Sequence, residues 1–196
     1  MTLEQWSHLP EDDLGEWIDG WLVEEEMPNV DHETVSAWTF LTVGGWLRPL
    51  GGKIYGSGVK YVLSDRRGRI PDLSVFLPGS QKPRRGNVVD FPPDIAVEIV
   101  SPSLTDQKRD RVEKLQEYAA FGVRYYWLMD PQLRLFDLRE LGPDGRYITA
   151  VSAMDGVIHD VPGCPGLTLN LDDLWAEIDA LEAAPVKGDT LNEVHG

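Results

Sequence analysis

The stretch PPDIAVEIVSPS, residues 92–103, decides the fold together with GVRYYWLMDP, residues 122–131. In the first, aliphatic residues occupy every second position, which is the period of a β-strand, and Glu98 lies on the opposite face. The apolar run at 124–129 indicates a strand buried on both faces. Between them, residues 106–121 carry apolar side chains at helical spacing. The order strand–helix–strand predicts a βαβ unit with parallel strands.

The flanking sequence extends this unit into a mixed α/β fold. Residues 15–26 predict an N-terminal β-hairpin, because Asp19-Gly20 is a turn dipeptide between two apolar runs. Residues 31–48 predict a helix with Asp31 as its N-cap. We therefore expect a central mixed sheet flanked by helices. Shorter elements are expected as extended segments near 53–56, 59–63 and 70–77, antiparallel strands near 133–138 and 146–151, and an acidic helix at 171–182.

Length and composition are typical of one domain. The chain has 196 residues, of which 42% are hydrophobic, so it can bury one core of ordinary size. We expect a single domain over 1–183, a disordered tail at 184–196 and an exposed, mobile loop at 78–93. No apolar run approaches the ~18 residues that span a bilayer, and the N-terminus lacks the pattern of a signal peptide. With Cys164 as the one cysteine, these features predict a cytoplasmic protein without a membrane partner.

The charge is unevenly distributed along the chain. The net charge of −15 argues against binding to nucleic acid, because phosphate repels an acidic surface. However, 14 of the 18 Lys and Arg residues lie between residues 48 and 124. This segment is either a basic binding surface or an ordinary solvated face, and charge alone does not separate the two.

Two carboxylates in the middle segment are candidates for metal ligands. Asp72 follows Pro71 at the start of an apolar strand, and Glu98 lies within another strand. A carboxylate inside a strand is costly to bury unless it is paired or binds a metal. Two such groups on neighbouring strands would form an oxygen site suited to Mg²⁺ or Mn²⁺. Alternatively, Asp72 is a turn residue at a strand edge and Glu98 pairs with an arginine.

A positive side chain is also needed if such a site hydrolyses phosphodiesters, because it holds the attacking water and offsets charge on phosphorus. The residue two positions after Glu98, on the same strand face, is Val100 and cannot do this. Lys114, on the following helix, can reach the carboxylates, and Tyr118 one turn later could orient it. The alternative is that Lys114 forms a surface pair with Asp110, four residues earlier.

The order of these motifs resembles a known family. The first motifs in chain order are EWIDGWLV at 16–23, Asp31-His32 at a helix start and PDLSVF at 71–76. They are followed by PPDIAVEIVSPS, D-x-x-x-K at 110–114, Tyr118 and finally GVRYYWLMDP. From about residue 14 to 140, this compound pattern is similar to the Uma-type restriction-endonuclease family, a branch of the PD-(D/E)xK nuclease superfamily. In that family the lysine is displaced from the strand onto the following helix, as Lys114 is here.

The resemblance implies a fold, an activity and roles for particular residues. It implies a restriction-endonuclease-like core and an endonuclease that depends on Mg²⁺ or Mn²⁺. Asp72 and Glu98 would bind the metal, and Lys114 would position the attacking water. Glu16 would add a distant carboxylate and His32 would contact the metal shell.

DNA is the expected partner of such an enzyme, and a cutter of both strands is expected to be a symmetric homodimer or a higher homo-oligomer. Two alternatives stay open: an inactive nuclease-fold module that binds or interacts without cutting, and an enzyme acting on a smaller phosphate ester. The residues expected to contact the DNA backbone are Arg66, Arg67, Arg69, Lys82, Arg84 and Arg85.

Overall fold

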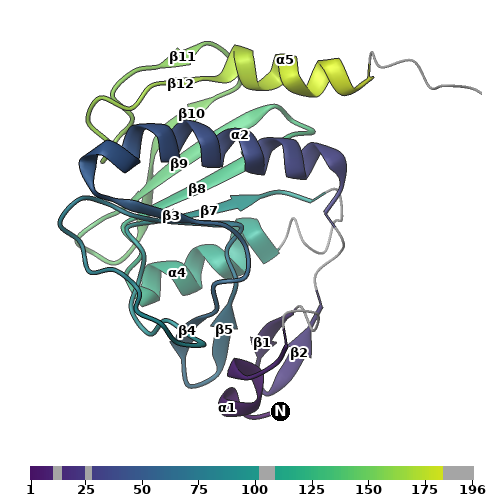
Figure 1. The fold of residues 1–196 in the computed structure, drawn as a ribbon, viewed down its shortest axis with the longest axis vertical. Helices are drawn as coiled ribbons and strands as arrows, with labels where there is room; N and C mark the ends of the chain where they lie inside the picture. Colours follow the sequence, from purple (N-terminus) through teal and green to yellow (C-terminus); the bar gives the residue numbers. More distant parts are fainter. Residues whose placement is uncertain (11–14, 25–27, 102–108, 183–196) are drawn as a thin grey trace, which may run out of the picture.

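A six-stranded mixed sheet with strand order β10-β9-β8-β7-β6-β3 forms the centre of this computed structural model, which describes residues 1–10, 15–24, 28–101 and 109–182 (Figure 1). Strands β7 and β8 are parallel, and all other neighbours in the sheet are antiparallel. The predicted βαβ unit is therefore confirmed. The strands are β3 (Lys53–Tyr55), β6 (Leu73–Phe76), β7 (Ile95–Ile99), β8 (Tyr125–Asp130), β9 (Leu135–Leu141) and β10 (Tyr147–Ala153).

Helices cover both faces of this sheet. Helices α2 (Val30–Leu47) and α5 (Leu171–Glu182) lie on one face, and α4 (Leu115–Phe121) lies on the other (Figure 1). Alternate residues of β7 point to opposite faces of the sheet and therefore belong to different hydrophobic cores. Ile95, Val97 and Ile99 belong to the large core under α2 and α5, whereas Ala96 packs in the smaller core under α4. The strand phase inferred from the sequence is thus confirmed, and it directs Glu98 toward the α4 side.

A second, four-stranded antiparallel sheet with the order β2-β1-β5-β4 carries the predicted hairpin. Its turn residues Asp19 and Gly20 both have positive φ, 53° and 89°, as a two-residue turn of this kind requires. Trp6 is fully buried against Gly68, where an added Cβ would lie 2.6 Å from its ring. The bounds are α1 (Leu3–Ser7), β1 (Glu16–Ile18), β2 (Trp21–Val23), β4 (Tyr61–Ser64) and β5 (Arg67–Arg69).

Several boundaries differ from the expectations. Helix α2 is capped by Asn29, not Asp31: the Asn29 side chain accepts a hydrogen bond from the amide of His32 at 2.9 Å. The helix expected at 106–121 is described from residue 109; its first part, Arg109–Lys114, is a π-helix that leads into α4. The expected tail at 184–196 lies outside the described residues. Short elements that the sequence did not predict are α1, β5, a 3-10 turn η1 (Arg48–Leu50), β11 (Val157–Ile158) and β12 (Leu169–Asn170).

The length and hydropathy of a helix decide whether it can cross a membrane. Among the described residues, no helix is both long enough and apolar enough to cross a bilayer.

Candidate active site

Glu98 is buried on the α4 face of β7 and is held by two helix side chains. Its side chain is 2% exposed. Lys114 Nζ donates to Glu98 Oε2 at 2.8 Å, and Tyr118 Oη donates to Glu98 Oε1 at 2.7 Å. Lys114 and Tyr118 are four residues apart and therefore share one stripe of the helix. Tyr118 was expected to orient Lys114, but its hydroxyl instead holds the other oxygen of Glu98.

Asp72 lies beside Glu98, immediately before the first residue of β6. Leu73 pairs with Val97 in the antiparallel strands β6 and β7. Asp72, the residue before Leu73, therefore lies opposite Glu98, the residue after Val97. Asp72 Oδ2 accepts a hydrogen bond from the amide of Ile99 at 2.7 Å. Its side chain is 16% exposed, which leaves it open to solvent, unlike Glu98. The two expected carboxylates therefore lie side by side where the inner strands β6 and β7 pair, at the start of β6 and near the end of β7.

His32 reaches the same place from the first turn of α2. Its Nε2 lies 3.3 Å from Asp72 Oδ1. The amide of His32 is fixed by the Asn29 cap, so the start of α2 sets the position of the ring. Of the two accessory residues implied by the family resemblance, His32 thus adjoins Asp72.

The other accessory residue, Glu16, adjoins Lys114. Glu16 Oε1 lies 3.6 Å from Lys114 Nζ, and Glu16 Oε2 accepts a hydrogen bond from Arg69 Nη1. Arg69 Nε donates to Glu117 Oε2 at 2.6 Å. Each of Glu16, Arg69 and Lys114 is almost completely buried. These ion pairs join β1 and β5 of the second sheet to the helix that carries Lys114.

Burial and charge act in opposite directions on these groups. Burial alone would raise the pKa of Glu16, but the positive charges of Lys114 and Arg69 and its hydrogen bonds outweigh burial and lower it. For Arg69, burial acts to lower the pKa, but the charges and hydrogen bonds of Glu16 and Glu117 outweigh burial. The pKa of the Arg69 guanidinium is therefore raised above its ordinary value. Burial, followed by the charge of Glu98, raises the pKa of Tyr118 well above 10. Tyr118 therefore keeps its proton at neutral pH and stays a donor.

The lowered pKa of Glu16 predicts an acid-sensitive contribution to stability. In the unfolded chain Glu16 takes up a proton near its ordinary pKa of 4.5, before it does so in the folded protein. The contribution of Glu16 is therefore present above that pH and is lost as the pH falls toward the lower folded pKa. We expect the free energy of unfolding in urea to fall more steeply between about pH 5 and pH 3 for the wild type than for Glu16→Gln. Parallel curves for the two proteins would contradict the ion pairing of Glu16.

The arginines expected to contact DNA have different environments. Arg69 is fully buried between two carboxylates, so the expectation that it contacts the DNA backbone was wrong. Arg66 is 70% exposed and pairs with Asp19. Arg67 is partly exposed and pairs with Asp19 and Glu117, and Lys82 donates to the carbonyls of Leu77 and Ser80. Arg84 and Arg85 are exposed.

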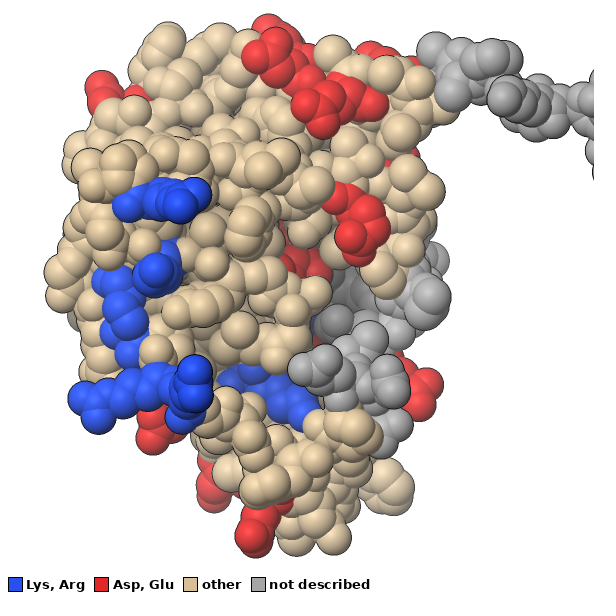
Figure 2. Space-filling view, in the orientation of Figure 1, with Lys and Arg blue, Asp and Glu red and all other residues tan. Residues whose placement is uncertain are grey.

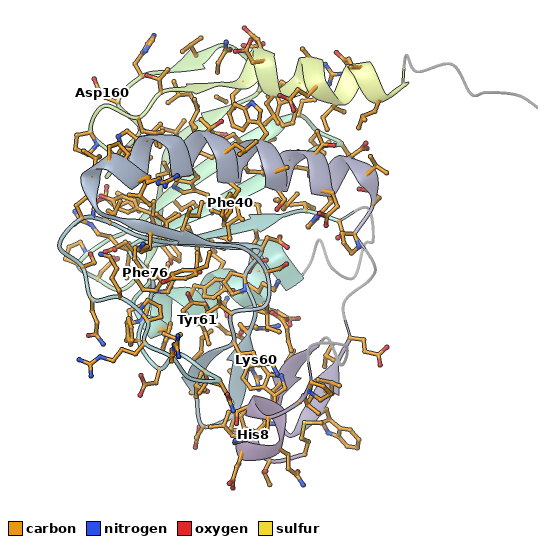
Figure 3. All side chains as sticks on the ribbon, in the orientation of Figure 1. His8, Phe40, Lys60, Tyr61, Phe76 and Asp160 are labelled. Carbon is orange, nitrogen blue, oxygen red and sulfur yellow. The ribbon has the colours of Figure 1, made fainter. Side chains whose placement is uncertain are left out.

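Figure 2 shows several basic side chains along one side of the molecule. Not every cation in the middle of the sequence contributes to this surface. Lys60, labelled in Figure 3, is directed toward the N-terminal segment and donates to the carbonyls of Trp6 and Leu9 at 3.0 and 3.1 Å.

Glu117 is a site residue that sequence reasoning missed. It accepts from Arg69 and from Arg67, whose Nε donates at 2.9 Å. The sequence contains one signal for it: Glu117 lies three residues after Lys114 and therefore near the same helix face. That spacing does not reveal its partners, which come from β5.

The central mixed sheet with helices on both faces defines a mixed α/β protein, and this fold is also found in a solved structure. A solved structure with the same fold is the crystal structure of "a putative nuclease belonging to DUF820" from Anabaena variabilis ATCC 29413. It is 21% identical, with a TM-score of 0.69 over 90% of this chain and 98% of that chain. Curated proteins gave no match.

A match to a protein-family model assigns the chain to a particular family. The Uma2 model, described as "Putative restriction endonuclease", matches residues 2–172. The chain belongs to the Uma2 family. The resemblance seen in the motifs, and the fold class expected from it, are confirmed.

Proposed function

We propose that this protein is an endonuclease that hydrolyses phosphodiester bonds in DNA with the help of Mg²⁺ or Mn²⁺. The observation that carries the proposal is the convergence of Asp72, Glu98 and Lys114 at one end of β7. Membership of the Uma2 family supports nuclease activity, and the chemistry of the three side chains supports the metal.

The donor set fits a hard divalent ion. Asp72 and Glu98 offer carboxylate oxygens, the type of ligand that Mg²⁺ and Mn²⁺ prefer. No group of three or more His, Cys, Asp or Glu side chains within the described residues is arranged to hold a metal. Asp72 and Glu98 would therefore hold the ion with water completing its shell, which suits Mg²⁺. When bound, the ion supplies Lewis acidity and a more acidic water.

The chain's own residues supply the remaining functions. The Lys114 ammonium, placed by Glu98 and Glu16, would hold the attacking water and offset the charge that develops on phosphate. Tyr118 remains a neutral donor and fixes Glu98. His32 steadies Asp72 from the opposite side. These groups are set before substrate arrives, which is how preorganised sites lower a barrier.

DNA would be held by exposed cations outside the buried network. Arg66, Arg84 and Arg85 are exposed and can contact phosphates, with Arg67 and Lys82 as partly exposed neighbours. Such contacts give affinity without reading sequence. Cleavage of both strands would be served by a homodimer, and the cytoplasm is the expected compartment.

The first test is Asp72→Asn, which keeps the shape of the side chain but removes its charge. We expect Mn²⁺ binding measured by calorimetry to weaken at least about tenfold, and cleavage of plasmid DNA to fall by about 100-fold. Asp65→Asn, an exposed turn residue, is the matched control and should behave as the wild type. Undiminished cleavage by Asp72→Asn would contradict the metal assignment.

The same assay separates the alternatives. A wild-type protein that binds DNA and Mn²⁺ but does not cut would be an inactive nuclease-fold module. Cleavage of nucleotide esters without cleavage of DNA would instead indicate a smaller substrate.

A further inference from the structure

The outward face of α2 is apolar although it is exposed to solvent. No charged residue occurs between Glu33 and Arg48, so more than three turns of a surface helix carry only apolar, small or hydroxyl side chains. Leu41 is 72% exposed and Phe40 is 38% exposed. Figure 3 shows Phe40 projecting from the middle of α2.

Small residues flank these two side chains. Ala37 is exposed one turn before Leu41, and Gly45 is exposed one turn after it. A Cβ added to Gly45 would meet no atom within 4 Å, so another backbone can approach closely there. A helix that faces water would not be expected to present this pattern.

The two ends of this face carry opposite charges. Glu33 at the N-terminal end is 64% exposed on its side chain, and Arg48 follows the C-terminal end and is also exposed. Along the line of α2, Figure 2 shows an uncharged area with basic atoms at its left end and acidic atoms at its right end. Glu33 Oε1 lies 3.9 Å from His32 Nδ1, a long contact that leaves the carboxylate accessible.

We propose that α2 is the contact surface of a symmetric dimer, packed antiparallel against α2 of a second copy of this chain. A twofold axis that passes between Phe40 and Leu41 places Phe40 of one copy level with Leu41 of the other. The same axis places Glu33 level with Arg48 of the second copy, and the open Gly45 level with the small residue Ser36. Apolar residues therefore meet apolar residues and each charge meets its opposite, as an interface formed by one repeated patch requires.

The charge pattern selects a second copy as the occupant. An unrelated partner would have to supply an apolar helix with the reverse order of charges, whereas an antiparallel copy supplies it automatically. A parallel copy would bring Glu33 against Glu33 and Arg48 against Arg48, which costs energy. Two ion pairs at the rim fix the register, and the central Phe40 and Leu41 supply the buried apolar area.

The experiment is sedimentation velocity of the full chain, whose monomer mass is 22.0 kDa. At about 50 µM we expect the wild type to sediment as a dimer. Leu41→Lys should raise the dissociation constant by at least about 100-fold and give a monomer, because two ammonium groups would be buried near the axis. Leu133→Lys, at a site 54% exposed in the turn between β8 and β9, is the control and should remain dimeric.

A charge exchange tests the register. Glu33→Arg and Arg48→Glu should each weaken the dimer about tenfold, since each reverses one member of two symmetric pairs. The double variant restores both pairs and should return to within about threefold of the wild type. A monomeric wild type, a dimeric Leu41→Lys variant or a double variant without recovery would each overturn the proposal. Because the readout is mass, this proposal and the nuclease assignment can fail separately.

Discussion

Lys114→Met is expected to reduce DNA cleavage by about 1,000-fold at saturating metal, while metal binding is retained. Lys114 Nζ lies 2.8 Å from Glu98 Oε2 and 3.6 Å from Glu16 Oε1, so its charge stands beside the proposed metal ligand. Methionine preserves most of the apolar stem but cannot hold water or offset charge on phosphate. The measurement is the rate of plasmid cleavage, with Lys53→Met, at an exposed lysine that begins β3, as the control.

The same substitution also destabilises the fold, and this effect must be separated from catalysis. Removal of the lysine deprives two buried carboxylates of a cation, which costs about 3 kcal/mol or more. Adding Glu16→Gln removes one of those carboxylate charges and should recover part of the free energy of unfolding. Cleavage should not recover with it. A folded double variant that cleaves within about tenfold of the wild type would show that Lys114 is only structural.

The sequence could predict the half of the site that depends on local periodicity. Alternation along 94–100 assigns Glu98 to the face opposite the aliphatic residues, and Glu98 does lie on the α4 side of the sheet. The spacing of four between Lys114 and Tyr118 puts both on one helix stripe, and both bind Glu98. Strand and helix periods are set by backbone geometry, so they can be read without knowledge of distant contacts.

The rest of the site depends on contacts between distant segments, which periodicity does not encode. Arg69 was expected to contact the DNA backbone together with Arg66 and Arg67, which are close to it in the sequence. Its actual position follows from pairing of β5 with β1, which brings Glu16 beside it, and from the packing of Glu117 from α4. Strand β5 has three residues, too few for a recognisable alternation.

Arg69→Met is the second substitution with a large expected effect, and this effect is on stability. Arg69 is 0% exposed and contacts Glu16, itself 1% exposed, as well as Glu117. Breaking a buried pair leaves a carboxylate without its partner, which typically costs about 3–5 kcal/mol. For Arg69→Met we expect a loss of stability near the lower end of this range, for two reasons. Lys114 remains near Glu16, and Arg69 Nη2, which has no hydrogen-bond acceptor among the described residues, is removed with the side chain.

We therefore expect the free energy of unfolding to fall by about 3 kcal/mol and the midpoint of thermal unfolding by about 10 °C. Arg66→Met is the matched control, because its pair with Asp19 is exposed and should contribute less than about 1 kcal/mol. Combining Arg69→Met with Glu16→Gln should cost less than the sum of the single changes by more than about 1 kcal/mol, since both act on one ion pair. Additive costs would mean that Arg69 stabilises the protein through packing, and the second sheet would then not be tied to α4 by charge.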